Sequence, residues 1–346
     1  MPCTPRPDRS EPVRLSVVIP AYNEAGNLGS LLRTLTERLA ACTPLWEVIV
    51  VDDGSRDATA AAIAPWLSRP GIRLLRLSRN FGKEAALTAG IDRATGDAVV
   101  LMDGDGQHPP ELIAPMLAAW RDGADMVCAA RASRDDGSLV RRLGTRIFYW
   151  LVNVGSPVAI ASASGDFRLM DRRVVEALKS LPERNRFMKG LYAWVGFETR
   201  TVPYVPEPRG IGRSSFSLRG LTRLGLTGVT AFSNTPLRLW SAIGAVMALF
   251  AFAFGMWFVF EHFMTDHPVP GWATLVVSTA FFSGIQLLSI GILGEYIGRI
   301  FDEVKQRPVY VIAHEAGRAT FDEIAPPVPV AVAPVEIAAR TPRAAA

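Results

Sequence analysis

The chain has 346 residues, of which 49% are hydrophobic and 20% charged, and its mean hydropathy is +0.20. This composition excludes disorder for most of the chain, and the length allows two or three domains that each bury a core. A net charge of +4 does not indicate a nucleic-acid-binding protein, and the three widely spaced cysteines indicate neither a disulfide framework nor a zinc site. We therefore expect no nucleic-acid partner.

The chain begins with a polar segment and continues with alternating strand and helix patterns. Residues 1–13 are rich in proline and arginine and lack the apolar stretch of a signal peptide, so we expect a disordered N-terminus that is not exported. The strands are predicted at 14–20, 46–51, 72–77, 98–102 and 126–130. The helices between them are predicted at 28–41, 57–67, 83–94 and 111–121. This alternation predicts an α/β domain over residues 14–212 with a doubly wound, mostly parallel sheet.

Residues 213–236 form a basic segment between the α/β domain and the apolar part of the chain. Leucines and phenylalanines alternate with arginines here, and no acid occurs between Arg209 and Arg238. Amphipathic helices of this kind can lie on an anionic bilayer surface. A helix packed against the α/β domain explains the first half of the segment equally well.

Two uncharged runs follow, of 22 residues at 239–260 and of 27 residues at 268–294. As a helix, the shorter run spans about 33 Å, enough for a hydrocarbon core of about 30 Å. We predict transmembrane helices at 237–262 and 271–298 with a short loop at 263–270. The alternative, two buried helices of a soluble core, fits less well because core helices seldom stay uncharged for so long.

Lysine and arginine lie on only one side of the two runs. Arginines precede the first run, Arg299, Lys305 and Arg307 follow the second, and the loop at 263–270 carries no lysine or arginine. The positive-inside rule then places the α/β domain and both termini in the cytoplasm and the loop outside. Residues 299–312 are accordingly a cytoplasmic return segment, and 313–346, rich in alanine and proline, are expected to be a disordered tail.

Acidic side chains stand where two of the predicted strands end. Asp52 and Asp53 close the second strand, and Asp103 and Asp105, with Gln107, follow the fourth. Doubly wound sheets bind their ligands beyond the carboxyl ends of the strands. Carboxylates there can accept hydrogen bonds from a nucleoside, and an Asp-x-Asp turn offers hard oxygens to Mg²⁺ or Mn²⁺. Taken singly, each motif is also common in plain surface turns.

These motifs occur in order with others further along the chain. The strings are SVVIPAYNE at 16–24, DDGS at 52–55, NFGK at 80–83, DGDGQHPPE at 103–111, GDFRLM at 165–170 and LPERNRFMKG at 181–190. Together they resemble the polyprenyl-phosphate branch of family 2 glycosyltransferases, which includes dolichol-phosphate mannose synthase and bacterial enzymes that glucosylate undecaprenyl phosphate. The resemblance covers residues 15–306. It implies a GT-A fold and a multi-pass protein of the bacterial cytoplasmic membrane.

For the nucleotide sugar, the resemblance implies contacts from the first two strand ends. By this resemblance, the base and the ribose are contacted by Pro20, Tyr22, Glu24 and Asp53, and Asp52 is also assigned to this site. Lys83 is also expected in the nucleotide-sugar site.

The Asp-x-Asp-x-Gln turn implies a site for the divalent metal and the diphosphate. It falls on Asp103, Asp105 and Gln107, with Asp105 and Gln107 as the direct metal ligands and Asp105 as a catalytic residue. His108 stands where the family often has aspartate. We expect His108 to face solvent or to pack on the loop, with an extra metal ligand as the alternative.

The family's later basic motif ends in lysine, where this chain has Ser215. Ser215 is therefore not carried over, and Arg209 and Arg213 are assigned to the nucleotide sugar, with Arg213 as the candidate to supply the missing charge. For the acceptor phosphate the resemblance implies Arg131, which is also assigned as a catalytic residue, and Arg134 is a second candidate. Asp166 is implied as a catalytic acid that either acts as a base or holds a hydroxyl group.

The reaction implied is the inverting, Mg²⁺- or Mn²⁺-dependent transfer of a hexose from a nucleotide sugar to polyprenyl phosphate in the bilayer. UDP-glucose is the favoured donor, and GDP-mannose is next. One alternative is a processive polysaccharide synthase, for which we expect a Gln-x-x-Arg-Trp motif and more spans. Another is a catalytically silent membrane scaffold. By family analogy the assembly is a homo-oligomer, a tetramer.

Overall fold

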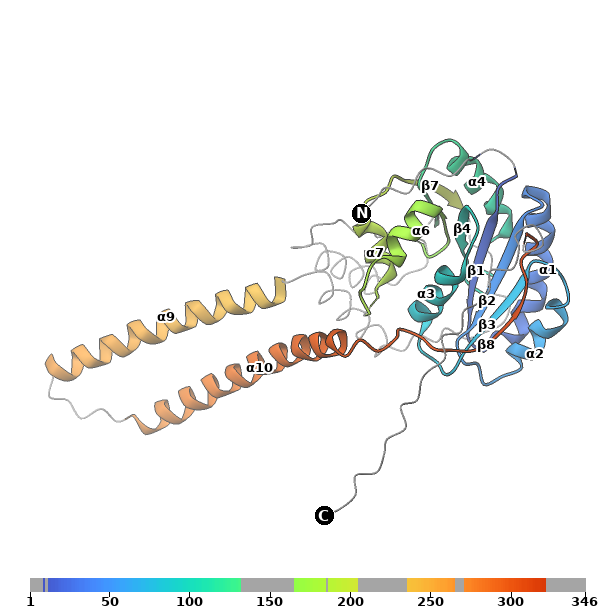
Figure 1. Ribbon diagram of the computed structural model, residues 1–346. Coiled ribbons are helices and arrows are strands. Elements are labelled where there is room, and N and C mark those ends of the chain that lie inside the picture. Colours follow the sequence, from blue (N-terminus) through green and yellow to red (C-terminus); the bar gives the residue numbers. More distant parts are fainter. Residues whose placement is uncertain are drawn as a thin grey trace, which may run out of the picture.

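The structure is a computed structural model that describes Arg9 and residues 12–131, 165–184, 186–204, 235–264 and 271–321 (Figure 1). Two parts are seen: an α/β domain and, projecting from it, a pair of long helices. The chain enters the sheet first, leaves it for the helix pair, and then returns to the sheet.

Strands and helices alternate through the first 131 residues, as predicted. The strands are β1 (Leu15–Ala21), β2 (Trp46–Asp52), β3 (Ile72–Leu77), β4 (Ala98–Leu101) and β5 (Met126–Arg131). The helices are α1 (Ala25–Cys42), α2 (Thr59–Ile63), α3 (Lys83–Arg93) and α4 (Ile113–Arg121), with single 3₁₀ turns at Ala64–Trp66 and Pro110–Leu112. After the gap come β6 (Arg168–Asp171), α6 (Arg172–Lys179), α7 (Met188–Trp194) and β7 (Thr199–Tyr204).

One eight-stranded sheet carries the domain, in the order β7-β5-β6-β4-β1-β2-β3-β8. The central strands β4, β1, β2 and β3 are parallel, while β6 runs antiparallel to both of its neighbours. The carboxyl ends of β1, β2 and β4 therefore meet at one edge of the sheet. The predicted mostly parallel, doubly wound sheet is confirmed, with antiparallel strands at β6 and β8.

Both faces of the sheet are covered, because alternate residues of each central strand face opposite ways. Val17 on β1 joins the core under α1 and α4, whereas its neighbour Val18 joins the core under α3, α6 and α7. Helix α1 presents buried leucines at helical spacing, namely Leu28, Leu31, Leu32, Leu35 and Leu39. This amphipathic stripe explains why the segment forms a helix against the sheet.

The C-terminal part of the chain completes the sheet, which corrects the predicted boundary of the tail. Strand β8 (Ile312–Gly317) pairs antiparallel with the edge strand β3, and Glu315 forms an ion pair of 2.9 Å with Arg73. Beyond it, Phe321 is buried. The prediction of disorder from residue 313 was wrong for 313–321, because strand pairing, an ion pair and the burial of Phe321 order this mostly polar segment. Residues 322–346 lie outside the described part.

The N-terminal boundary is also earlier than predicted. Val13 is completely buried in the core under α1. Arg9 forms an ion pair of 2.8 Å with Asp171 and stacks on Trp120. The expected disorder of residues 1–13 was therefore wrong at these positions, where a buried valine and a buried carboxylate hold the chain.

The two predicted apolar helices are present as α9 (Thr235–Met264) and α10 (Trp272–Val304). Figure 1 shows them as an extended hairpin whose open end faces the α/β domain. Windows of 18 and 28 residues, at Trp240–Trp257 and Val277–Val304, are long and apolar enough to cross a membrane, and none of either window is buried within the protein. These helices indicate membrane association. Residues 213–234 of the predicted amphipathic segment and 265–270 of the loop lie outside the described residues.

Candidate active site

Two turns at the carboxyl ends of β1 and β2 are tied together by hydrogen bonds. The amide of Asn23 donates to Ser55 Oγ at 3.0 Å, and Asn23 Oδ1 accepts from the amide of Arg56 at 2.9 Å. The amide of Glu24 donates to Thr59 Oγ1 at 3.0 Å. The predicted nucleoside residues from Pro20 to Glu24 are thus held beside the β2 turn.

The two acids of the β2 turn have different surroundings. Asp52 is completely buried, and its Oδ1 accepts the amide hydrogen of Ser55 at 2.8 Å. Asp53 accepts from the amides of Phe81 and Gly82 at 2.7 and 2.9 Å, so it also fixes the turn before α3. Burial raises the pKa of Asp53, and the two amides oppose this rise without cancelling it.

Gly54 lets the β2 turn approach the turn before α3. Its φ of +66° lies in the left-handed region, and a Cβ atom there would meet the backbone carbon of Arg79 at 2.5 Å. Only glycine fits such a position without a shift of the backbone. The close approach places the start of α3, and with it Lys83, at the site.

A row of alternating charges crosses the site. The ammonium of Lys83 lies 2.7 Å from Asp103 Oδ1 and 2.8 Å from Asp166 Oδ2, and Lys189 Nζ lies 3.5 Å from Asp166 Oδ1. The four residues come from α3, the β4 turn, the segment before β6, and α7. Four of the motifs distinguished in the sequence therefore meet at one point.

The charges in the row perturb one another. Burial opposes the ionisation of Asp166, but the ammonium groups of Lys83 and Lys189 outweigh it and hold the pKa of this carboxyl well below its ordinary value. Burial likewise opposes the charge on Lys83, and Asp103 and Asp166 raise the pKa of that ammonium above its ordinary value. Both groups are charged at neutral pH.

His108 is buried beneath the Asp-x-Asp turn. Its ring stacks on Phe167 with ring centres 5.0 Å apart, and its Nδ1 accepts the amide hydrogen of Asp103 at 3.2 Å. Burial lowers its pKa. The expected packing on the loop is confirmed and the solvent-facing position is wrong. The Nδ1 nitrogen is engaged by the loop's own backbone, which disfavours its use as a metal ligand.

The metal residues carried over offer two carboxylates and an amide oxygen. The backbone amide of Gln107 donates to Asp105 Oδ1 at 3.1 Å, which keeps the turn compact. Among the described residues no three His, Cys, Asp or Glu side chains gather as a metal cage. Two carboxylates with phosphate oxygens of a bound donor are nevertheless the usual ligands of Mg²⁺, and Asp103 already holds a cation, the Lys83 ammonium. The residues therefore fit a divalent cation shared with a diphosphate.

The remaining predicted residues are only partly placed. Arg131 is the last residue of β5 and stands in register with Tyr204 of β7. Nothing further is described of its side chain. Arg134, Arg209 and Arg213 lie outside the described residues, so their roles stay predictions.

Two residues of the site had no role in the sequence prediction. Lys189 lies in the LPERNRFMKG string, and Glu84 follows Lys83 directly. Burial, reinforced by the charge of Asp166, raises the pKa of Glu84 to about 7. Their position within or next to one of the listed strings was the available signal, and it does not reveal which groups meet across the fold.

Comparison with known proteins decides the family. Residues 16–179 match the model of glycosyl transferase family 2. The chain is 42% identical over 302 residues to an uncharacterized glycosyltransferase of Synechocystis sp., covering 87% of this chain and 95% of that protein. The chain belongs to glycosyltransferase family 2. This family 2 enzyme is also 44% identical over 301 residues to the bactoprenol glucosyl transferase of Shigella phage SfII, covering 87% of this chain and 97% of the relative.

Among solved structures, the chain is similar to the mannosyltransferase PcManGT of Pyrobaculum calidifontis, solved with GDP-Man and Mn²⁺, at 18% identity and a TM-score of 0.45. The match covers 88% of this chain and 90% of that one. Family membership confirms the expected glycosyltransferase activity and GT-A fold. Relatives named bactoprenol glucosyl transferase confirm the expected branch of the family.

Proposed function

We propose that this enzyme transfers glucose from UDP-glucose to a polyprenyl phosphate, with inversion at the anomeric carbon and with Mg²⁺ or Mn²⁺ on the leaving diphosphate. The observation that carries the proposal is the contact of Lys83 with both Asp103, which follows β4, and Asp166, which precedes the antiparallel strand β6 at the same edge of the sheet. Relatives named bactoprenol glucosyl transferase, which match 87% of the chain, support both the sugar and the acceptor. GDP-mannose is the next donor to test.

The donor is assigned to the turns after β1, β2 and β4. Tyr22, 41% exposed, offers a ring to the base, and Asp53 has lone pairs left for a ribose hydroxyl. Asp103, Asp105 and Gln107 are the residues that would hold the cation. When bound, the cation neutralises the charge that develops on the leaving diphosphate.

Lys83 is assigned to the same diphosphate as the cation. Its side chain is 41% exposed, and its ammonium already bridges the metal-binding turn and Asp166. An ammonium in this position can donate to a phosphate oxygen once the Asp103 carboxylate is shared with a cation. The leaving group is therefore neutralised by side chains that are in place before the donor arrives.

The acceptor needs little activation. The second pKa of a phosphate monoester is near 6, so the lipid phosphate is largely dianionic at neutral pH. One of its oxygens forms the new bond to the anomeric carbon while the bond from that carbon to the diphosphate oxygen breaks, and UDP leaves with the electron pair. No proton has to be removed from the nucleophile.

Asp166 therefore acts by position and not as a base. Its pKa is held well below the ordinary value by Lys83 and Lys189 after opposing burial is overcome, which makes it a weak proton acceptor. As a carboxylate it can accept hydrogen bonds from sugar hydroxyls and hold the two lysines apart. Arg131, which ends β5, is assigned to the acceptor phosphate.

The helix pair supports the proposal of a lipid acceptor. The open end of the α9–α10 hairpin faces the α/β domain, and the exposed apolar windows of both helices suit a bilayer (Figure 1). With the basic flanks inside, the catalytic domain lies on the cytoplasmic face, where the headgroup phosphates are found.

The test is transfer of labelled glucose into an organic-extractable product by the full-length chain. The reaction contains UDP-glucose, undecaprenyl phosphate in detergent and Mg²⁺ or Mn²⁺. Label that stays in the aqueous phase with every nucleotide sugar tried refutes the proposal. Failure to bind any nucleotide in calorimetry would instead favour a silent scaffold.

A further inference from the structure

Lys189 stands at one end of the charge row. Its ammonium lies 3.5 Å from Asp166 Oδ1, whereas Lys83 occupies the other oxygen, Oδ2, at 2.8 Å and contacts Asp103. The order along the row is thus Asp103, Lys83, Asp166 and Lys189. Lys83 lies between Asp103 and Asp166, and Lys189 lies on the other side of Asp166.

The contact between Lys189 and Asp166 is loose enough to be exchanged. At 3.5 Å the nitrogen is within ion-pair range of the carboxylate but beyond the usual length of a charged hydrogen bond, about 2.7–2.9 Å. The Lys189 side chain is 31% exposed. Its ammonium can therefore take a phosphate oxygen without breaking a short bond.

The backbone that carries Lys189 is held firmly. The amide of Met188 donates to Glu84 Oε2 on α3 at 3.2 Å, and the amides of Gly190 and Leu191 donate to the carbonyl of Phe187. Met188 and Leu191 are buried in the core under α3. Lys189 is thus presented to the site from a fixed turn and not from a loose surface loop.

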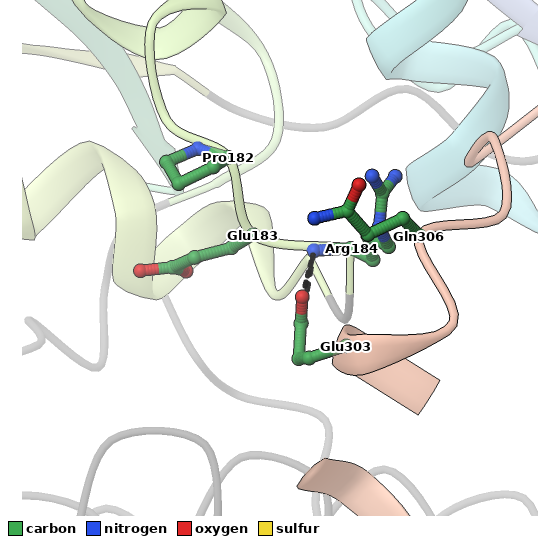
Figure 2. A pocket seen from close by; sticks show the side chains of 5 residues that line it. All are labelled: Pro182, Glu183, Arg184, Glu303 and Gln306. Atoms are coloured by element: carbon green, nitrogen blue, oxygen red, sulfur yellow. Dashed lines mark hydrogen bonds between the residues drawn. The ribbon is translucent and has the colours of Figure 1, made fainter. Parts of the chain in front are cut away.

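The segment before α7 reaches the end of the apolar hairpin. The amide of Arg184 donates to Glu303 Oε1 near the end of α10 at 2.9 Å, and Arg184 Nη1 donates to the carbonyl of Arg307 at 2.9 Å. Figure 2 shows Glu303 and Gln306 facing Arg184 across this junction. Arg184 therefore contacts the end of a candidate membrane helix, and Lys189, five positions further along the chain, contacts Asp166.

We infer that Lys189 binds the phosphate monoester of the lipid acceptor, while Lys83 serves the diphosphate of the donor; this rests on the proposed function. An acceptor whose chain lies along α10 brings its phosphate past the Arg184 junction to the side of Asp166 where Lys189 stands. Two phosphate groups must approach each other in this reaction, and one ammonium on each side of Asp166 neutralises both. Lys189 is then a specificity residue for a phosphate acceptor.

The experiment compares Lys189→Met, which keeps the aliphatic stem, with Lys189→Arg in the full-length chain. Initial rates give KM for undecaprenyl phosphate and for UDP-glucose separately. Loss of a charged hydrogen bond predicts a rise of about 10- to 100-fold in the acceptor KM of Lys189→Met, an unchanged donor KM, and recovery of most of the loss in Lys189→Arg. The matched control is Lys179→Met on α6, where the lysine pairs with Glu176 at the same 3.5 Å.

The outcomes separate this inference from the proposed function. If the wild-type chain transfers glucose to the lipid and Lys189→Met keeps its acceptor KM, the inference is overturned and the proposed function stands. A rise of the donor KM instead of the acceptor KM also overturns it. If the wild-type chain transfers no glucose to a lipid phosphate, both the proposed function and this inference are refuted. Thermal melting of each variant checks that it is folded.

Discussion

Glu84 makes the stability of the α/β domain depend on pH. It is the second residue of α3, is partly buried, and accepts the amide hydrogen of Met188. Burial, and then the charge of Asp166, raise its pKa from 4.5 to about 7. Between these two values the folded chain keeps a proton that the unfolded chain releases. Stability therefore falls as the pH rises through this window.

The size of the effect follows from the two pKa values. Each pH unit between the two pKa values lowers the free energy of unfolding by about 1.4 kcal/mol. The window from 4.5 to about 7 therefore limits the total loss above pH 7 to about 3 kcal/mol. Glu84→Gln removes the ionisation and keeps an oxygen for the Met188 amide. We expect its advantage over the parent chain to grow by about 2–3 kcal/mol between pH 5 and pH 8.

Unfolding of the full-length chain in detergent, followed by tryptophan fluorescence at pH 5, 6.5 and 8, measures this difference. Glu37→Gln, on the exposed face of α1, is the control and should leave stability unchanged at each pH. An advantage of Glu84→Gln that does not change with pH would refute the reasoning, as would a parent chain that is the more stable at pH 8.

Three further substitutions test other parts of the structure. Gly54→Ala should cost about 2 kcal/mol or more in unfolding experiments, because its φ is +66° and a Cβ meets the Arg79 backbone at 2.5 Å; a neutral effect would contradict the close packing. Ser16→Ala should cost about 1–3 kcal/mol, because the buried Ser16 Oγ accepts the Gly96 amide hydrogen at 2.8 Å; equal melting curves would show that water replaces it. Asp105→Asn keeps a side-chain oxygen for the backbone amide hydrogen of Gln107, so this variant should melt like the parent chain. It should nevertheless abolish glucose transfer, and a near-normal transfer rate would reject the assignment of Asp105 as a metal ligand.

The central part of the fold was predictable because local patterns specify it. Apolar runs such as the one at β2 have strand length, and their acidic ends mark the carboxyl edge of a parallel sheet. The position of Asp52 and Asp103 at one edge followed directly. Hydrophobic periodicity and turn residues were sufficient for these elements.

The remaining features depend on contacts between distant parts of the chain. Strand β8 is polar and is ordered by pairing with β3, and Lys189 meets Asp166 only because α7 packs under α3. The burial of His108 depends on the Phe167 ring that lies beneath it. None of these contacts leaves a periodic signal in the sequence, so pattern reasoning could name the residues but not their neighbours.

Strand β8 also sets the order in which this protein can be assembled during translation. Its partner strand β3 is made early, yet the ion pair between Arg73 and Glu315 joins residues 242 positions apart. The outer edge of β3 therefore stays open on the ribosome until both hairpin helices have been synthesised. An open strand edge is prone to aggregation. This edge is covered by β8 only after the apolar hairpin has been synthesised and can enter a bilayer. Completion of the sheet in this way follows synthesis of the apolar hairpin.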